Sequence, residues 1–400
     1  MRPDRCHWIL TAIALPLLAA CAADAPGDNA GVPQPAGSAA SAAAVAMDGD
    51  TGAAGSADAP AHAAGAMPVY LEFRDFTVAC DNGLRCEAVG VADDGGFGLV
   101  LGLSREAGAD GAQQLRLSAA EKALDAAGLR IDDRPAKALS TLPWQGDGEG
   151  ELSLDGTAVA DFIDIVRNGA RLSAGEGDAA VSLSLSGLSA ALLRIDEQQG
   201  RLDTRGAWLR RGTRDDAAAT PAPTLPLLVE AAAPPTLAEA DGTRLAQQLR
   251  AEQAEALRSA DCDAPRDGFD LATQDTAAAL DADHALVFLA CLGGAYQTSS
   301  LVFRVGRAGE DATRVVPPVP ATLAGVVPGD FALLTNAGYD ADTATLSHFA
   351  KGRGLGDCGE SAQWRYDGRE FQLAGYAAMR RCGGASPGDW PSLWRSDVVR

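Results

Sequence analysis

The chain has 400 residues, a length that allows two domains of ordinary size. It contains 33 basic and 54 acidic residues, which gives a formal net charge of −21. This charge argues against nucleic acids and anionic lipid surfaces as partners, because both repel an acidic protein. Charge and composition do not indicate a fold, so the architecture has to be inferred from patterns along the chain.

The first 20 residues have the features of a secretory signal peptide. Arg2 and Arg5 give a positive start, and an apolar stretch from Trp8 to Ala20 follows. That stretch is shorter than the roughly 20 residues that a membrane-spanning helix needs. We therefore expect residues 1–20 to be a cleaved signal peptide, and no other stretch of the sequence predicts a membrane span.

The end of this segment, Leu18-Ala-Ala-Cys21, resembles the bacterial lipobox. The resemblance implies cleavage before Cys21 and lipid attachment at that cysteine. The lipid would then anchor the protein to a membrane. An ordinary signal peptide whose cleavage site precedes a cysteine is the alternative. Ala22 follows the cysteine, and by analogy with sorting in enterobacteria this favours the outer membrane. The expected location is the cell envelope, as a periplasm-facing lipoprotein.

Composition divides the mature chain into a tether and two domains. Residues 21–66 are rich in Ala, Gly, Ser and Pro, cannot bury a core, and are predicted to be a lipidated disordered tether. An N-terminal β-rich domain is predicted at 67–211 and a C-terminal α+β domain at 236–400. A Pro- and Ala-rich linker at 212–235 joins them. The fold class expected for the whole is α+β, with two β-rich domains that carry short helices.

The N-terminal domain is predicted to combine hairpins and short helices. Asn82-Gly83 lies between two β-rich segments and indicates a hairpin. Ser118-Ala-Ala-Glu121 resembles a capping box and predicts the start of a helix. Thr157–Gly169 has an amphipathic pattern that ends in glycine and predicts another helix. Strict alternation over Ala180–Ser186 predicts a strand, and a helix is expected over 187–200.

The C-terminal domain is predicted to begin with a helix and continue with strands. Leu245, Leu249 and Leu257 lie on one face of a helix that is expected to end near Cys262. Two apolar strands are predicted within 284–305, on either side of Gly293-Gly294. Hairpins are expected over 331–352 and around Asp367-Gly368.

The cysteines predict a cross-linked protein. Of the eight, Cys6 leaves with the signal peptide and Cys21 is the predicted lipid carrier. An even number in an exported chain predicts three disulfides among the other six. Because these fall in three local clusters, pairing of neighbours is expected, as Cys80–Cys86, Cys262–Cys291 and Cys358–Cys382.

The glycine-rich stretch KGRGLGDC, from Lys351 to Cys358, raises the question of phosphate binding. A P-loop needs its lysine after the glycines and a helix after the lysine. Here the lysine comes first and no helical pattern follows, so a turn closed by a disulfide at Cys358 is favoured. Lys351, Arg353 and Asp357 form a candidate recognition patch. An Arg353–Asp357 ion pair that stiffens the loop is the alternative.

No catalytic residue is predicted. Gly384-Ala-Ser386-Pro-Gly388 matches the nucleophile elbow G-x-S-x-G, but Pro387 has no N–H for an oxyanion and no histidine follows. Asp50-Thr-Gly resembles the aspartic-protease triplet but lies in the predicted tether. Chance explains both matches.

No metal or other cofactor is expected either. Asp281, Asp283 and His284 cluster before a strand and could hold a cation, but a polar strand entrance is favoured. Asp340-Ala-Asp342 lacks the later ligands of a calcium loop, so a hairpin tip is favoured there.

The tryptophans near the C-terminus are candidates for sugar stacking. Trp364, Trp390 and Trp394 offer flat aromatic faces. Packing at the edge of the core is the alternative and is favoured.

Two stretches resemble a known family. FRDFTVACDNGLRCEAVG (Phe73–Gly90) and KGRGLGDCG (Lys351–Gly359) resemble the bacterial envelope family known as domain of unknown function 1176. Cys382-Gly-Gly and the DWPSLWR stretch fit it too. The resemblance covers almost the whole mature body and implies an exported, cysteine-bridged protein without an established activity.

A second resemblance concerns the N-terminal domain alone. The cysteine hairpin, the helix that ends at Asn168-Gly169 and the stretch SLSLSGLSAAL resemble the invasion-associated locus B family, although this chain lacks a second cysteine pair expected there. This resemblance implies an interaction module of the envelope.

These observations predict a non-enzymatic binding or structural protein of the bacterial envelope. Its expected partner is another envelope protein or cell-wall glycan. One alternative is a periplasmic hydrolase of peptidoglycan or peptide, whose carboxylate pair would come together only on folding. Another is a lipoprotein inhibitor of a lysozyme or protease, in which a rigid disulfide loop plugs the active site.

Overall fold

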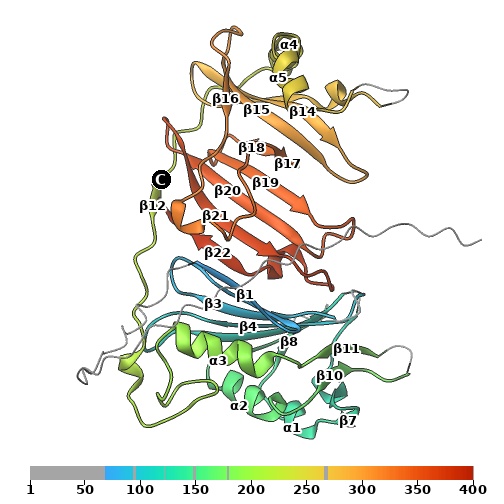
Figure 1. Cartoon of the computed structure of the whole chain (residues 1–400), viewed down its shortest axis with the longest axis vertical. Coiled ribbons are helices and arrows are strands. Elements are labelled where there is room, and N and C mark those ends of the chain that lie inside the picture. Colours follow the sequence, from blue (N-terminus) through green and yellow to red (C-terminus); the bar gives the residue numbers. More distant parts are fainter. Residues whose placement is uncertain are drawn as a thin grey trace, which may run out of the picture. The chain divides into compact units, whose positions relative to one another are not determined.

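Antiparallel β-sheets are the main regular structure of the described chain, and short helices pack beside them (Figure 1). The computed structural model describes residues 68–92, 96–120, 122–146, 150–177, 180–264 and 269–399. The predicted signal peptide, Cys21 and the predicted tether lie outside these residues. The β-rich sheets with few short helices confirm the predicted fold class. Among the helices described, none has the length and apolar character that crossing a membrane requires.

The N-terminal half is built on a seven-stranded sheet of order β1-β2-β3-β4-β5-β9-β8. Its strands are β1 (Val69–Phe73), β2 (Phe76–Cys80), β3 (Cys86–Gly90), β4 (Leu99–Arg105), β5 (Gln113–Ala119), β8 (Gln145–Gly146) and β9 (Glu151–Asp155). All neighbouring strands are antiparallel, and short connections join β1 through β5 in succession. The predicted hairpin at Asn82-Gly83 is confirmed, with a loop of residues 81–85 between β2 and β3.

A smaller four-stranded sheet and three α-helices complete this half. The sheet has the order β11-β10-β6-β7. Its strands are β6 (Leu129–Ile131), β7 (Arg134–Pro135), β10 (Arg171–Ala174) and β11 (Val181–Ser184). The helices are the 3-10 helix η1 (Ala126–Gly128), α1 (Lys137–Ser140), α2 (Thr157–Val166) and α3 (Leu188–Gln198). The strand β11 and the helices α2 and α3 lie where the sequence predicts them.

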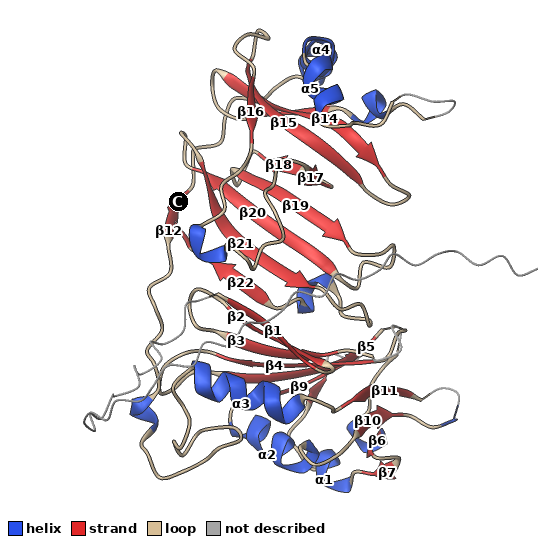
Figure 2. Ribbon diagram, in the orientation of Figure 1, coloured by secondary structure: helices blue, strands red, loops and turns tan. Residues whose placement is uncertain are grey.

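The core of this half forms between the seven-stranded sheet and helices α2 and α3, which lie along it (Figure 2). In α2 the buried residues Val159, Phe162, Ile163 and Val166 follow the spacing of one helix face. In β5 alternation turns Leu115 and Leu117 toward the same cluster. Burying each such side chain stabilises the fold by about 1.5–3 kcal/mol.

The helix predicted from Ser118-Ala-Ala-Glu121 is wrong. Ser118 and Ala119 are the last residues of β5, while Glu121 lies outside the described residues. Both neighbours of β5 hold it in the sheet, because Ser118 pairs with Val100 of β4 and with Glu151 of β9. Sheet pairing at long range overrides the local capping signal.

The C-terminal half contains two five-stranded sheets. The first has the order β13-β14-β15-β16, and a short strand β17 also pairs with β15. Its strands are β13 (Thr276–Ala279), β14 (His284–Gly293), β15 (Thr298–Gly306), β16 (Thr313–Val315) and β17 (Leu334–Thr335). The second has the order of its strands in the chain, β18 (Gly338–Asp340), β19 (Thr345–Lys351), β20 (Gly359–Tyr366), β21 (Phe371–Met379) and β22 (Ser392–Arg395). The predicted strands and hairpins of this half are confirmed.

The continuous apolar run of β14 is explained by burial on both faces of its sheet. Val287 and Leu289 belong to a cluster with helices α4 (Glu239–Glu252) and α5 (Ala254–Ser259). Leu286 and Phe288 belong to the opposite cluster, which the second sheet completes with residues such as Trp364. The single helix expected before Cys262 is in fact these two helices, which meet at Gln253.

The segment predicted as a linker, residues 212–235, contains regular secondary structure over part of its length. It contains the 3-10 helix η3 (Asp216–Ala218) and β12 (Leu227–Val229), and β12 pairs in parallel with β23 (Asp397–Val399). The remaining 3-10 helices are η4 (Leu271–Gln274), η5 (Ala321–Leu323) and η6 (Pro387–Asp389). Residues of both halves belong to one unit, Pro60–Arg400. The domain boundaries at 211 and 235 stay predictions.

Three disulfides cross-link the described cysteines. They are Cys80–Cys86, Cys262–Cys291 and Cys358–Cys382, each between neighbours in the sequence. The first joins the directly paired ends of β2 and β3. The third joins the residue before β20 to the loop after β21, and so closes one end of the last sheet.

Candidate functional site

A cavity of about 380 Å³ opens at the ends of β19, β20 and β21, beside the Cys358–Cys382 disulfide. Its volume falls within the roughly 300–1,000 Å³ of ligand pockets. The lining combines small and apolar residues with four polar or charged ones. The lining residues are Pro328, Ala350, Lys351, Gly352, Cys358, Gly359, Glu360, Tyr376, Ala378, Met379, Arg380 and Cys382.

The register of three neighbouring strands creates this cavity. Ala350 of β19 pairs with Glu360 of β20, which pairs in turn with Ala378 of β21. Directly paired residues point to the same face of a sheet. A carboxylate therefore lies between two alanines, whose short side chains leave the space above it empty.

Glu360 is the only carboxylate among the residues that line the cavity. Its side chain is 22% exposed, and its Oε2 accepts a hydrogen bond of 2.6 Å from the Tyr376 hydroxyl. Burial alone would raise the pKa of Glu360, but the neighbouring His348 and Tyr376 groups outweigh it and hold the pKa below its usual range. The carboxylate is thus ionised at neutral pH.

His348 lies behind this carboxylate, one row further into the sheet. Its Nδ1 accepts a hydrogen bond of 3.0 Å from the backbone N–H of Thr335, so the neutral ring carries its proton on Nε2. That Nε2 lies 3.5 Å from Oε1 of Glu360, which is long for a hydrogen bond. The ring is only 5% exposed. His348 therefore lies behind Glu360 on the protein side, and its Nε2 has no full hydrogen bond among the described residues.

Tyr376 and Arg380 complete the polar part of the wall. Burial, and then the neighbouring Glu360 carboxylate, raise the pKa of Tyr376 well above its usual range, so the phenol stays a donor. Arg380 is close enough to lower the pKa values of both Glu360 and Tyr376 by its charge. Its guanidinium lies 4.3 Å from the centre of the Tyr70 ring and donates to the Val326 carbonyl.

The glycine-rich loop forms one edge of the cavity, and its cations and anion are partly paired. Nε of Arg353 donates to Asp357 at 2.7 Å, so the alternative interpretation of this patch, an Arg353–Asp357 ion pair within the loop, is what the structure has. Asp357 also accepts the N–H groups of Gly383 and Gly384 at 3.0 and 2.8 Å. The ion pair with Arg353 holds the pKa of the Asp357 carboxyl below its usual range, against the effect of burial. Lys351, by contrast, lines the cavity.

Glycine is required where this loop enters β20. Gly359 has a φ of +144°, and a Cβ there would lie 2.0 Å from the Ala350 carbonyl oxygen. A residue with a side chain could not occupy this position without moving the Ala350 backbone, so the tight turn requires glycine here.

The three tryptophans are placed differently from one another. Trp364 and Trp390 are buried, and Trp390 stacks on Phe349 with ring centres 5.4 Å apart. Neither offers a face to a sugar. Trp394 is half-buried and lines a separate hollow of about 350 Å³, together with Pro226 and Phe371.

The remaining sequence motifs do not assemble into sites among the described residues. Ser386 precedes η6, and no histidine is among the residues that line the hollow beside it. Asp281 accepts from the backbone N–H of His284 at 2.8 Å and contacts its ring, so this pair satisfies itself at the entrance of β14. The Asp50 triplet lies outside the described residues.

A cluster that could hold a metal by geometry alone consists of Asp357, Cys358 and Cys382. Both sulfurs are in a disulfide and cannot act as thiolate ligands. Asp357 is already engaged by Arg353. This cluster therefore does not suit a metal.

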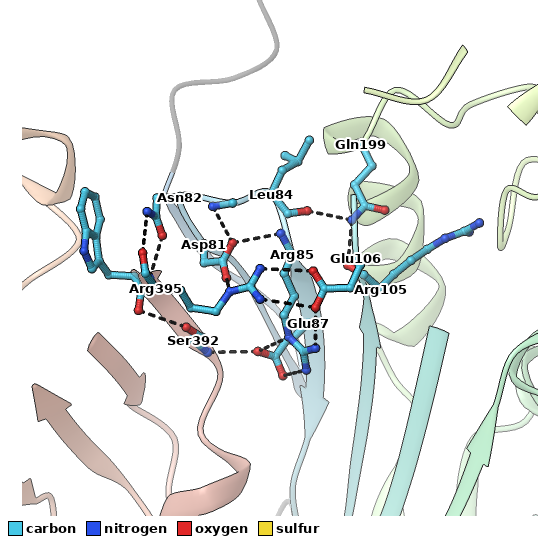
Figure 3. Close-up of polar contacts among 12 residues, drawn as sticks. Asp81, Asn82, Leu84, Arg85, Glu87, Arg105, Glu106, Gln199, Ser392 and Arg395 are labelled. Atoms are coloured by element: carbon cyan, nitrogen blue, oxygen red, sulfur yellow. Dashed lines mark hydrogen bonds and ion pairs between the residues drawn. The ribbon is translucent and has the colours of Figure 1, made fainter. Parts of the chain in front are cut away.

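A second buried polar network joins the two halves of the chain (Figure 3). Asp81, whose side chain is 0% exposed, accepts from Gly83 N–H at 2.8 Å, from Arg85 N–H at 3.0 Å and from Nε of Arg395. Arg395 also pairs with Glu106 at 3.2 Å. No lining residue of the cavity takes part in it.

Sequence reasoning did not identify Glu360, Tyr376, Arg380 or His348 as site residues. No motif marks them, because their proximity depends on strand register. A usable signal was present in β20 and β21, where Glu360 is the one acidic residue of its strand and alanines recur at 377 and 378.

The fold and the cavity define a β-rich, disulfide-bonded protein with a pocket of ligand size. The chain belongs to the family described as "Protein of unknown function (DUF1176)", whose match covers residues 70–397. It is 32% identical over 337 residues to the uncharacterized protein YpfG of Escherichia coli (strain K12). The alignment covers 82% of this chain and 93% of YpfG. No solved structure is a significant match. Similarity to the invasion-associated locus B family is not shown by these comparisons.

Proposed function

We propose that this protein is a lipid-anchored envelope protein that binds a ligand without transforming it, and that the cavity around Glu360 is its binding site. The observation that carries the proposal is the row Ala350–Glu360–Ala378, which sets an ionised carboxylate in an open cavity. A group that only stabilised the fold would be fully paired and covered. Glu360 is paired on one side and open on the other.

The same geometry favours binding over hydrolysis. Glycoside hydrolysis uses two carboxyl groups that flank the scissile bond. The lining of this cavity includes one, Glu360. A nucleophilic mechanism needs a base within reach of a hydroxyl or thiol, whereas the Tyr376 phenol is held protonated and the cysteines are in a disulfide.

The envelope location is part of the proposal and is supported by sequence and cross-links together. Three disulfides persist in oxidising compartments and are rare in the cytosol. The Leu18–Cys21 lipobox supplies an anchor. In this view Cys21→Ser releases the protein from the membrane fraction of the cell. Unchanged association of this variant with membranes would contradict the lipid anchor.

Photo-crosslinking in living cells tests the binding function. Leu355 is 59% exposed on the loop that borders the cavity, so a photoreactive amino acid in its place reaches a bound partner. We expect an adduct with a defined envelope protein or cell-wall fragment that is lost when Ala378→Leu fills the cavity. The matched control places the same amino acid at Leu193, which is exposed on α3. The same adducts at both positions, or an adduct that survives Ala378→Leu, would contradict the proposal.

A second candidate is an inhibitor of an envelope hydrolase such as a lysozyme or protease. It is favoured by the exposed side chains of Leu355 and Tyr296 on and beside a loop closed by a disulfide. A rigid loop with an apolar tip can fill the active site of another enzyme at a low cost in conformational entropy. In that case the adduct from position 355 is the hydrolase, and Leu355→Asp restores its activity.

A further inference from the structure

A polar hollow of about 510 Å³ lies on the four-stranded sheet of the N-terminal half. Its lining comes from β6, β10 and β11, from the turn between β6 and β7, and from the connection between β10 and β11. It shares no lining residue with the Glu360 cavity. Its volume lies within the roughly 300–1,000 Å³ of ligand pockets.

Strand register gathers polar side chains on this face of the sheet. Ser173 of β10 pairs with Arg130 of β6 on one side and with Ser182 of β11 on the other. Directly paired residues point to the same face, and Arg171, two residues before Ser173, points the same way. The opposite face carries Leu172, which is buried in the core. Alternation along the strands and the lining of the hollow therefore agree that these four polar side chains face it.

The two serine hydroxyls have no partner within the described part of the chain. Ser173 is only 5% exposed, yet neither its hydroxyl nor that of Ser182 is hydrogen-bonded to another described residue. A buried hydroxyl is normally hydrogen-bonded, so these groups depend on their opening onto the hollow. Each can donate one hydrogen bond and accept two. Both are therefore available to a ligand.

Arg130 forms one wall of the hollow and is held in place. Its Nε and Nη2 donate to the Asp133 carbonyl at 3.2 and 3.0 Å, and its Nη1 lies 2.7 Å from a carboxylate oxygen of Glu176. The guanidinium thus joins the turn after β6 to the connection after β10. The Glu176 side chain is 81% exposed, so its carboxylate keeps lone pairs that can accept from a ligand.

The charges of the described lining residues cancel. Arg130 and Arg171 are the cations, and Asp133 and Glu176 are the anions. A simple anion or cation would be attracted and repelled in equal measure. None of the described lining residues has a large apolar side chain, so the hollow does not suit an apolar ligand either. A neutral ligand whose groups both donate and accept hydrogen bonds matches hydroxyls, guanidinium groups and carboxylates together.

We infer that this hollow is a carbohydrate-binding site that takes one or two neutral sugar residues, with neighbouring hydroxyls of a ring on Ser173 and Ser182. The Cβ atoms of directly paired residues lie about 4.5–5.5 Å apart, a spacing that two adjacent sugar hydroxyls can bridge. The Arg130–Glu176 pair supplies a donor and an acceptor at the side. The inference goes beyond the proposed function, since it assigns a second site that is independent of Glu360.

The test measures binding of neutral disaccharides to the purified full chain by ligand-observed NMR and calorimetry. The probes are maltose, cellobiose, lactose and diacetylchitobiose, and sodium phosphate and ethylammonium chloride serve as competing ions. We expect at least one disaccharide to bind and neither ion to displace it. Failure of all four disaccharides to bind, or displacement of the sugar by either ion, would overturn the inference.

Variants of the hollow locate the site. Ser173→Ala and Ser182→Ala should each weaken the bound sugar about three- to tenfold, as loss of one hydrogen bond predicts. Ala180→Trp fills the hollow from an exposed lining position and should weaken binding at least about tenfold, which keeps the test valid if a serine variant does not fold. The matched control is Ser189→Ala, which removes an exposed hydroxyl outside the hollow. Equal effects of the hollow and control variants would contradict the inference.

Ala378→Leu, which fills the Glu360 cavity, separates this inference from the proposed function. It should leave disaccharide binding unchanged. Loss of binding in Ala378→Leu but not in Ala180→Trp would place the sugar in the Glu360 cavity, which overturns the inference while the proposed function stands. Loss in Ala180→Trp alone supports the site in the hollow, whatever adducts form from position 355.

Discussion

Asp81 and Glu360 both lie beside disulfides, and their surroundings differ. Asp81 follows Cys80, is fully buried, and accepts from two backbone N–H groups and from Arg395 (Figure 3). Glu360 lies next to the Cys358–Cys382 disulfide, accepts one short bond and opens to a cavity. The oxygens of Asp81 accept hydrogen bonds from groups of the protein itself, whereas those of Glu360 can still accept hydrogen bonds from a ligand. Burial and charge alone therefore do not identify a binding residue, and the decisive feature is what remains unpaired.

The largest expected effect concerns the two disulfides. Cys358 and Cys382 are 24 residues apart and Cys80 and Cys86 only 6, so the chain-entropy account assigns about 3.5 and about 2.4 kcal/mol to them. Replacing both cysteines of a pair with alanine should lower the free energy of unfolding by these amounts. Urea denaturation measures the difference, and a larger loss from the Cys80–Cys86 pair would contradict the loop-length account.

Arg395→Met should have the next largest effect. It leaves the Asp81 carboxylate buried with its backbone donors but without its cation, and breaking such a pair costs about 3 kcal/mol. Arg210→Met is the matched control, since the Arg210–Asp203 pair is exposed and should cost less than about 1 kcal/mol. Thermal unfolding of the two variants compares them. Equal melting temperatures of the two variants would contradict the structural role assigned to the Asp81 network.

Tyr376→Phe should have a moderate effect. It removes the one short hydrogen bond to Glu360, which is a bond to a charged group worth about 1.5 kcal/mol or more. The remaining exposure of the carboxylate to the cavity limits the loss. Urea denaturation at neutral pH checks this expectation, and a loss as large as that of Arg395→Met would show that the two networks are equally structural.

Glu360→Gln should have the smallest effect on stability, below about 1 kcal/mol, because glutamine can still accept from Tyr376. The folded state holds the pKa of Glu360 below the ordinary value of 4.5, so ionised Glu360 stabilises the fold above that pH. This contribution is lost as the pH falls through the folded-state pKa. The difference in unfolding free energy between the natural chain and Glu360→Gln should be constant from about pH 6 to 8 and shrink below 4.5. A difference that grows on acidification would contradict this sign.

The comparison also explains what could be predicted from sequence. Hairpins such as that at Asn82-Gly83, helices α2 and α3, and the pairing of neighbouring cysteines depend on local signals and were predicted correctly. The helix at Ser118 was not, because pairing with β4 and β9 overrides its local pattern. The hairpin signal at Asp367-Gly368 located the turn but not its length, since the loop spans residues 367–370.

The site itself could be predicted only in part. The glycine-rich loop drew attention to Lys351, which does line the cavity. Glu360 and Ala378 are brought together with Ala350 by the register of β19, β20 and β21. Nothing in the spacing of these residues fixes that register, because hydrogen bonds between whole strands and the packing of Trp364 and Tyr366 determine it.

The pairing of Asp81 with Arg395 has a consequence for how the chain reaches its final form. The two residues are 314 positions apart, so the hairpin that carries Asp81 can form long before its cation arrives. Contacts at such separation slow folding, since a long segment must be ordered before they are made. Until Arg395 arrives, the Asp81 carboxylate has to remain hydrated, and the face of the hairpin around it stays exposed to solvent. Closure of this face is therefore a late step, and a chaperone or protease that acts on the incomplete chain would meet an exposed, acidic turn closed by a disulfide.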